Sequence, residues 1–154
     1  ALIRDEPENP YFHELKGQML VDFGRINEAL PSYRKSVELL DHAPLIRIAY
    51  AHALIESRGG NETLETAIKN LERALTDEKR SGRAYRLLAT AHGRLGREDI
   101  AKVYLAEEAV LQQKYDYAKR QAELAMTTLK PGSKEYLMAQ DIISYVENND
   151  DLDN

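Results

Sequence analysis

Between residues 83 and 108, apolar side chains recur with the spacing of two successive α-helices. The first helix is expected to carry its apolar stripe at Tyr85, Leu88, Ala89, His92 and Leu95. The pattern stops at Gly96 and restarts in a second stripe at Ile100, Ala101, Tyr104 and Leu105. We expect Ala89 and Ala101 where these two antiparallel helices cross most closely, because larger side chains would push the helices apart.

The tetratricopeptide repeat typically has an aromatic residue followed by Leu and Ala three and four residues later. A glycine in the turn and an alanine five residues after that glycine complete the pattern. Equivalent second-helix alanines occur at positions 29, 67, 101 and 118. The last step is 17 residues, half a repeat, so the helix from about 98 to 113 is expected to serve two units. The predicted fold is an all-α, right-handed tetratricopeptide-repeat solenoid of about eight helices.

The repeat domain is expected to span residues 1–147, with repeats at about 10–41, 44–76, 82–113 and 115–147. Residues 1–9 are interpreted as the end of a truncated upstream repeat, because prolines at positions 7 and 10 cannot continue a helix. The chain begins without Met and is interpreted as an excised piece. Residues 148–154 are expected to form an acidic, disordered tail.

Equivalent stripes are assigned to the other repeats. In the first repeat Gly17 is the predicted close-approach site, and the stripe comprises Phe12, Leu15, Met19 and Leu20. The second repeat is matched to the third by pairing Leu45, Ile48, Ala49 and His52 with Tyr85, Leu88, Ala89 and His92. Its turn, around residues 57–61, is expected to be about six residues longer than the others. The last helix, from about 133 to 147, is expected to use Tyr136, Leu137, Ile142, Ile143 and Val146.

Composition narrows the possible functions. Apolar residues make up 43% of the chain and charged residues 31%, which suits a helical protein with solvated outer faces. The net charge of −5 argues against a partner that presents a phosphate backbone. There is no Cys, which excludes disulfides and thiolate chemistry. No apolar run is long enough to cross a bilayer, and no signal-peptide pattern is present in this sequence.

Candidate catalytic residues are few. His13-Glu14 resembles the start of the zinc-protease motif His-Glu-x-x-His, but the second imidazole would fall on Gly17. We expect His52 and His92 to pack in or near the core, and we interpret Glu107-Glu108 as solvated surface. No nucleophile constellation or phosphate-binding loop occurs. The chain is therefore not expected to be an enzyme or to hold a metal or another cofactor.

The best candidate for partner binding is a basic stretch. Six Lys or Arg residues and no acid lie between Lys79 and Arg97. Three of them, Arg83, Arg86 and Arg94, share the helix face that is expected to line the concave wall of the solenoid. There they could attract an acidic segment or the carboxyl terminus of another protein. The alternative is a solvated face whose charge is balanced by surrounding acids. Tyr11 and Tyr50 are candidate aromatic anchors on the same wall, although ordinary packing explains them equally well.

Three short segments, 9–18, 43–49 and 139–142, carry a family resemblance. Together they resemble the C-terminal tetratricopeptide-repeat domain of bacterial periplasmic zinc metalloproteases related to HtpX and the CAAX prenyl proteases, of the type of the beta-barrel-assembly-enhancing protease. The resemblance covers residues 1–143. It implies a periplasmic location, a zinc site in an upstream domain, and repeats that engage outer-membrane proteins or their assembly machinery. No zinc ligand can be transferred to this chain, because it contains no matching motif.

Two hypotheses follow. In the first, the chain is a non-catalytic interaction domain of a periplasmic zinc protease, and its concave face engages a substrate, an assembly partner or the catalytic domain. In the second, it is a cytoplasmic tetratricopeptide scaffold or regulatory protein unrelated to proteolysis. In neither hypothesis does the chain bind nucleic acid or insert into a membrane.

Overall fold

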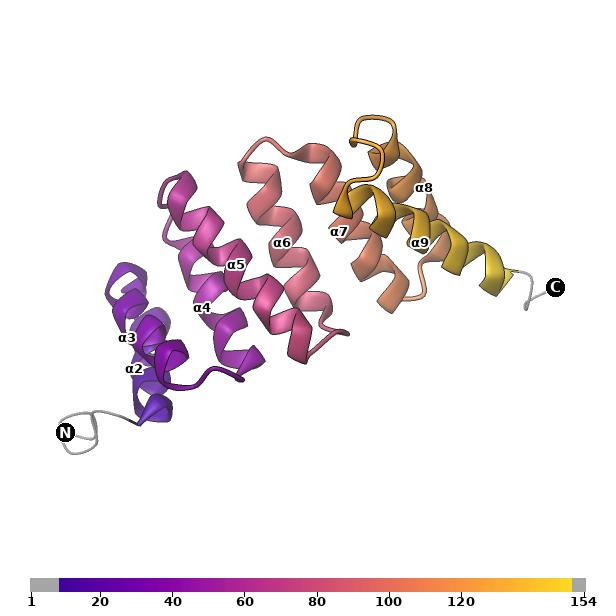
Figure 1. Ribbon diagram of the computed structural model, residues 1–154. Helices are drawn as coiled ribbons and strands as arrows, with labels where there is room; N and C mark the ends of the chain where they lie inside the picture. The colour runs from indigo at the N-terminus through magenta and orange to yellow at the C-terminus, as the bar shows by residue number, and fades with distance from the viewer. Residues whose placement is uncertain (1–8, 151–154) are drawn as a thin grey trace. The chain divides into compact units, whose positions relative to one another are not determined.

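The computed structural model describes residues 9–150 and contains eight α-helices and no strand within that range (Figure 1). The helices are α2 (Pro10–Asp22), α3 (Ile26–Leu39), α4 (Pro44–Glu56), α5 (Asn61–Asp77), α6 (Gly82–Arg94), α7 (Glu98–Leu111), α8 (Tyr115–Met126) and α9 (Lys134–Asp150). They fall into two compact units, and the second begins at Arg80. Of the segment 1–9, interpreted as the end of a truncated upstream repeat, residues 1–8 lie outside the described residues.

The first unit contains two helical hairpins, α2–α3 and α4–α5, which meet where α3 packs against α4. Pro10 occupies the first turn of α2, where its missing N–H costs least, and Asn9 caps that turn through its side chain, which accepts a hydrogen bond from the N–H of Tyr11 at 3.0 Å. The α2–α3 turn passes through Gly24, whose φ of +75° is the left-handed conformation that glycine adopts without strain. Ser36 on α3 donates a hydrogen bond to the carbonyl of Pro10 at 2.7 Å, which links α3 to the start of α2.

The crossing of α2 and α3 depends on Gly17. A Cβ atom at this position would lie 2.9 Å from two ring carbons of Tyr33, closer than carbon atoms can approach. The Tyr33 ring therefore fills the space that a side chain at position 17 would need, and it is almost fully buried. The predicted close-approach site is confirmed.

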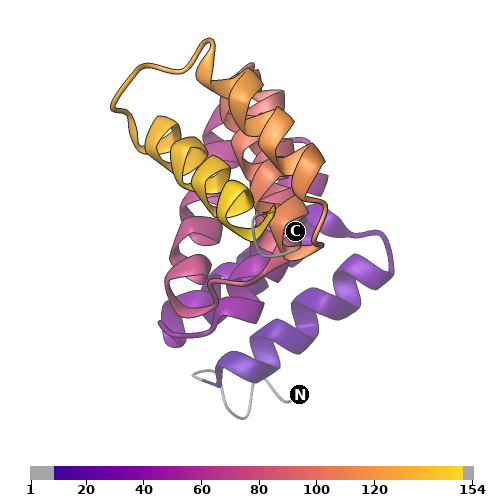
Figure 2. The ribbon, with the colours of Figure 1, turned by 90° about the vertical axis from the view of Figure 1, so that its right-hand side faces the viewer.

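The second unit is built around α7. This helix packs against α6, α8 and α9, so one helix serves two successive pairs, as the half-repeat spacing predicts. Figure 2 shows α8 and α9 as a hairpin joined by the loop after Met126. Small and branched side chains from α7, α8, α9 and the loop between α8 and α9 form a buried core: Val103, Ala106, Ala109, Ala118, Ala122, Ala125, Leu129, Ala139, Ile142 and Val146.

Two expected boundaries differ from the structure. Helix α9 continues to Asp150, so residues 148–150 are helical where a disordered tail was expected, and 151–154 lie outside the described residues. The turn before α5 comprises only residues 57–60. The additional residues instead lengthen α5, which has 17 residues where α3 and α7 have 14 each.

The expected match between the second and third repeats is wrong by two residues. The helices α4 and α6 begin at Pro44 and Gly82, an offset of 38, whereas pairing Leu45 with Tyr85 assumes an offset of 40. With the observed offset the buried positions coincide, for example Ala51 with Ala89 and Leu54 with His92. Because two residues turn a helix by about 200°, the wrong offset assigned some outward-facing residues to the core, although Ile48 is buried as expected. Leu45 is accordingly 75% exposed.

Parts of the other predicted stripes are also exposed. In α2 both Leu15 and Met19 are about half exposed, and in α9 Leu137 is too. Within the described residues α2 packs chiefly against α3, which covers only one side of the predicted stripe. The spacing of the apolar residues is helical in each case, but no described helix covers that side.

Exchanging two helical glycines for alanine tests the close approach. We expect Gly17→Ala to lower the free energy of unfolding by about 1–2 kcal/mol, because the clash with the Tyr33 ring exceeds the gain in helix propensity. The matched control is Gly93→Ala in α6, where a Cβ meets nothing within 4 Å, and where we expect a gain of about 0.5–1 kcal/mol. Urea unfolding followed by circular dichroism measures both, and equal shifts in the two variants would refute the packing argument.

Candidate functional site

The three arginines of the predicted basic face lie on one exposed side of α6, in the second unit. Arg86 donates a hydrogen bond from Nε to Oε2 of Glu108 on α7 at 2.8 Å, and its side chain is 63% exposed while that of Glu108 is 14% exposed. Arg83 and Arg94 also interact with other groups of the protein. The face is basic and accessible, but part of its charge is already balanced within the unit.

The two candidate tyrosines belong to the first unit and differ in exposure. Tyr11, near the start of α2, is 60% exposed. Tyr50 on α4 is only 6% exposed, and its ring stacks on that of Tyr33 with the centroids 6.5 Å apart. Burial raises the pKa of the Tyr50 hydroxyl, and the nearby guanidinium of Arg34 opposes that shift. Tyr50 is therefore mainly a packing residue.

The histidines have separate environments. His92 is buried, and its ring stacks on Tyr104 with the centroids 5.5 Å apart, so the predicted packing role is confirmed. The side chain of His52 is 43% exposed, and its Nε2 lies 3.6 Å from Oε1 of Glu56. The prediction that His52 packs in or near the core is wrong, because it rested on the incorrect offset between α4 and α6.

The interpretation of Glu107 and Glu108 as solvated surface is also wrong. Glu108 is mostly covered and paired with Arg86. Glu107 is largely buried beside Asp141 of α9, and burial together with that negative charge raises the pKa of the Glu107 carboxyl to about 7. Burial raises the pKa of the Tyr85 hydroxyl on α6, and the charge of the nearby Glu107 carboxylate raises it further. Adjacent glutamates on α7 thus have different roles.

No metal centre is evident. Among residues 9–150, no three His, Cys, Asp or Glu side chains lie together in a way that could hold a metal ion. The partial zinc motif would need a second imidazole at position 17. That residue is Gly17, and the Tyr33 ring fills the space that a side chain there would occupy. Within the same range, no helix combines the length and the apolar composition needed to cross a membrane.

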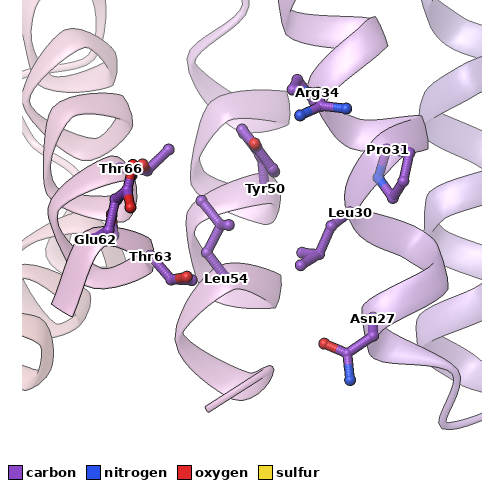
Figure 3. A pocket seen from close by; sticks show the side chains of 9 residues that line it. All are labelled: Asn27, Leu30, Pro31, Arg34, Tyr50, Leu54, Glu62, Thr63 and Thr66. Atoms are coloured by element: carbon purple, nitrogen blue, oxygen red, sulfur yellow. Dashed lines mark hydrogen bonds between the residues drawn. The ribbon is translucent and has the colours of Figure 1, made fainter. Parts of the chain in front are cut away.

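A cleft of about 600 Å³ lies in the first unit between α3, α4 and α5 (Figure 3). Helix α4 contributes the nearly buried side chains of Tyr50 and Leu54. The other lining residues come from α3 and α5: Asn27, Leu30, Pro31, Arg34, Glu62, Thr63 and Thr66. We call this surface the α3–α5 cleft.

The sequence does not reveal the cleft, because its residues come from three helices and span positions 27–66. Asn27, Arg34 and Glu62 are exposed polar residues of the kind that any helix surface carries. The one unusual feature in the sequence is Pro31, a proline inside a helix, whose side chain is exposed at the edge of the cleft. Helix periodicity alone gives no reason to group it with Glu62.

Comparison with known proteins supports the fold. No protein-family model and no curated protein sequence matches the chain. A crystal structure of MamA aligns over 99% of this chain and 84% of its own, with a TM-score of 0.68 and 18% identity. A second MamA structure covers 94% of this chain and 73% of its own, with a TM-score of 0.68 and 19% identity.

MamA is a helical-repeat protein of the tetratricopeptide type. The chain has a tetratricopeptide-repeat fold. The predicted all-α fold class is confirmed. At these identities the likeness concerns the fold alone and assigns no partner to either surface.

The buried carboxyl of Glu107 predicts a pH-dependent stability. Its pKa is raised from 4.5 to about 7, so the folded state binds the proton more tightly than the unfolded state. The resulting stabilisation is complete below pH 4.5 and is lost as the pH rises through about 7. We expect the free energy of unfolding of the native protein to fall by about 2–3 kcal/mol relative to Glu107→Gln between pH 4.5 and pH 8.

Urea titrations at several pH values measure this difference. Glu123→Gln, at an exposed position on α8, is the matched control, and its stability is expected to run parallel to that of the native protein. A difference between the native protein and Glu107→Gln that does not change with pH would contradict the burial of this carboxyl.

Proposed function

We propose that the chain is a non-catalytic domain that binds other proteins. The observation that carries this proposal is the tetratricopeptide-repeat fold, in which paired helices bury their apolar stripes against neighbours and present their remaining faces as a binding surface. Two surfaces are available: the basic face of α6, formed by Arg83, Arg86 and Arg94, and the α3–α5 cleft.

The parent protein, in this proposal, is a periplasmic zinc-dependent metalloprotease. The resemblance of segments 9–18, 43–49 and 139–142 supports it. The structure places these segments at the start of α2, at the start of α4 and within α9. Zinc would be held by a separate catalytic domain, and the repeats would engage an outer-membrane protein, its assembly machinery or that catalytic domain.

The reading frame upstream of Ala1 tests the parentage. A signal peptide and a His-Glu-x-x-His helix encoded in the same frame are the expected findings. A frame that lacks both would contradict the protease and favour the alternative, a cytoplasmic tetratricopeptide scaffold. This test is independent of whether either surface binds a protein.

Changing the charge of the α6 face tests its role in binding. The probe is a urea-unfolded outer-membrane β-barrel protein, rapidly diluted and presented to the immobilised 154-residue protein. We expect Arg83→Glu, Arg86→Gln and Arg94→Glu together to weaken its binding roughly tenfold, because exposed charges contribute about 0.2–1 kcal/mol each. Gln is chosen at position 86 because a carboxylate there would face Glu108.

The matched control makes the same change in net charge elsewhere in the second unit: Lys114→Glu, Arg120→Gln and Lys130→Glu, all at exposed positions. Binding by this control should remain close to that of the native protein. Equal affinity for the native protein and the α6 variant would remove these arginines from the binding surface.

A further inference from the structure

We propose that the α3–α5 cleft binds a short, extended peptide segment that inserts one aliphatic side chain and carries an acidic group towards Arg34 and a basic group towards Glu62. The inference rests on the proposed protein-binding function and specifies a ligand for a surface other than the α6 face. It is carried by an apolar floor, by two charges of opposite sign that have no ion-pair partner within residues 9–150, and by the spacing of Asn27 and Arg34 along α3.

The floor of the cleft is apolar and held in place. Tyr50 and Leu54 present only the parts of their side chains that face the cleft, since each is 6% exposed. Stacking of Tyr50 on the buried ring of Tyr33 fixes its orientation. Figure 3 shows Leu30 of α3 extending towards α4, the helix that carries Tyr50 and Leu54. A preformed apolar floor of this kind suits one aliphatic side chain, because no ordering of the protein opposes its burial.

The rim of the cleft carries one positive and one negative side chain, and the Glu38 carboxylate, one helical turn after Arg34, also lies near enough to act on Tyr50. Arg34 of α3 and Glu62 of α5 both line the cleft, and neither side chain forms an ion pair with any residue in the range 9–150. Other arginines of the first unit do form ion pairs, as Arg25 does with Glu28 and Arg73 with Asp41. A ligand with one acidic and one basic group would complement this pair, whereas a ligand with two like charges would meet repulsion at one side.

The spacing along α3 suits about three extended residues. Asn27 and Arg34 are seven residues apart in α3, which at 1.5 Å per residue is roughly 10 Å. An extended peptide advances about 3.3 Å per residue, so three residues cover that distance. The Asn27 side chain makes no hydrogen bond to any described residue, which leaves its amide available to a peptide backbone.

The probe is the blocked peptide Lys-Gly-Leu-Gly-Asp, labelled with fluorescein through an amino-terminal spacer and titrated with the full 154-residue protein. We expect replacement of its Leu by Gly to weaken binding roughly tenfold, because the aliphatic contact with the floor is lost. Replacement of its Asp by Lys should weaken binding about two- to fivefold, because the second Lys faces Arg34.

The variant Arg34→Glu provides the decisive comparison, because it leaves two acidic groups on the rim. We expect it to reverse the preference, so that Lys-Gly-Leu-Gly-Lys binds more tightly than Lys-Gly-Leu-Gly-Asp. The matched control is Lys16→Glu, an identical charge change at an exposed position of α2 outside the cleft, which should keep the native preference. Circular dichroism checks that both variants are folded.

Two results would overturn the inference: no saturable binding of the probe peptide to the native protein, or the same peptide preference in Arg34→Glu as in the native protein. The unfolded outer-membrane protein then separates the two proposals. If it still binds the native protein and the Arg34→Glu variant equally, the cleft assignment fails and the protein-binding function stands. If neither probe binds the native protein, both proposals fail.

Discussion

The fold depends on how closely two antiparallel helices can approach. At the α2–α3 crossing Gly17 has no side chain, and the space is filled by the Tyr33 ring, which in turn stacks on Tyr50 of the next hairpin. Alanines take the corresponding place in the second helices, where Ala29, Ala67 and Ala118 are completely buried. A bulky residue at any of these crossings would separate the helices and expose the larger side chains beside them. The small residues therefore allow the large ones to form the core.

Charged groups are used differently in the two units. In the second unit Glu108 is mostly covered and paired with Arg86, and Glu107 is largely buried near Asp141, where its raised pKa reflects the cost of ionisation. In the first unit Arg34 and Glu62 border a cleft without ion-pair partners among residues 9–150. The same repeat fold thus contains one cluster of charges that acts on stability and another that is available to a ligand. Candidate binding residues cannot be ranked by charge alone, because a charged side chain that is already paired within the protein is less available to a ligand.

The errors in the sequence analysis share one physical origin. An apolar stripe shows that a helix forms, but it does not show which neighbour covers each side of it. Pairing Leu45 with Tyr85 kept the helical period but wrongly placed Leu45 and His52 in the core. The period of a helix stays the same when the alignment is shifted by two residues, so it could not reveal the error. Helix starts decide the offset, and the longer α5 shifted the spacing between the second and third repeats. Glu107 was misjudged for the same reason: its burial comes from α9, more than 25 residues further along the sequence.

The amino-acid sequence by itself determined that the protein forms paired helices, that these follow the tetratricopeptide pattern, and that Gly17 and the repeated alanines lie at the crossings. Such features depend on side chains a few residues apart, so a local pattern encodes them fully. Tertiary structure alone decided which faces are covered, that Glu107 is largely buried, and that Leu30, Leu54 and Glu62 border one cleft. Those properties arise where three helices meet. The residue pattern within one helix does not show which side chains of the neighbouring helices pack against it.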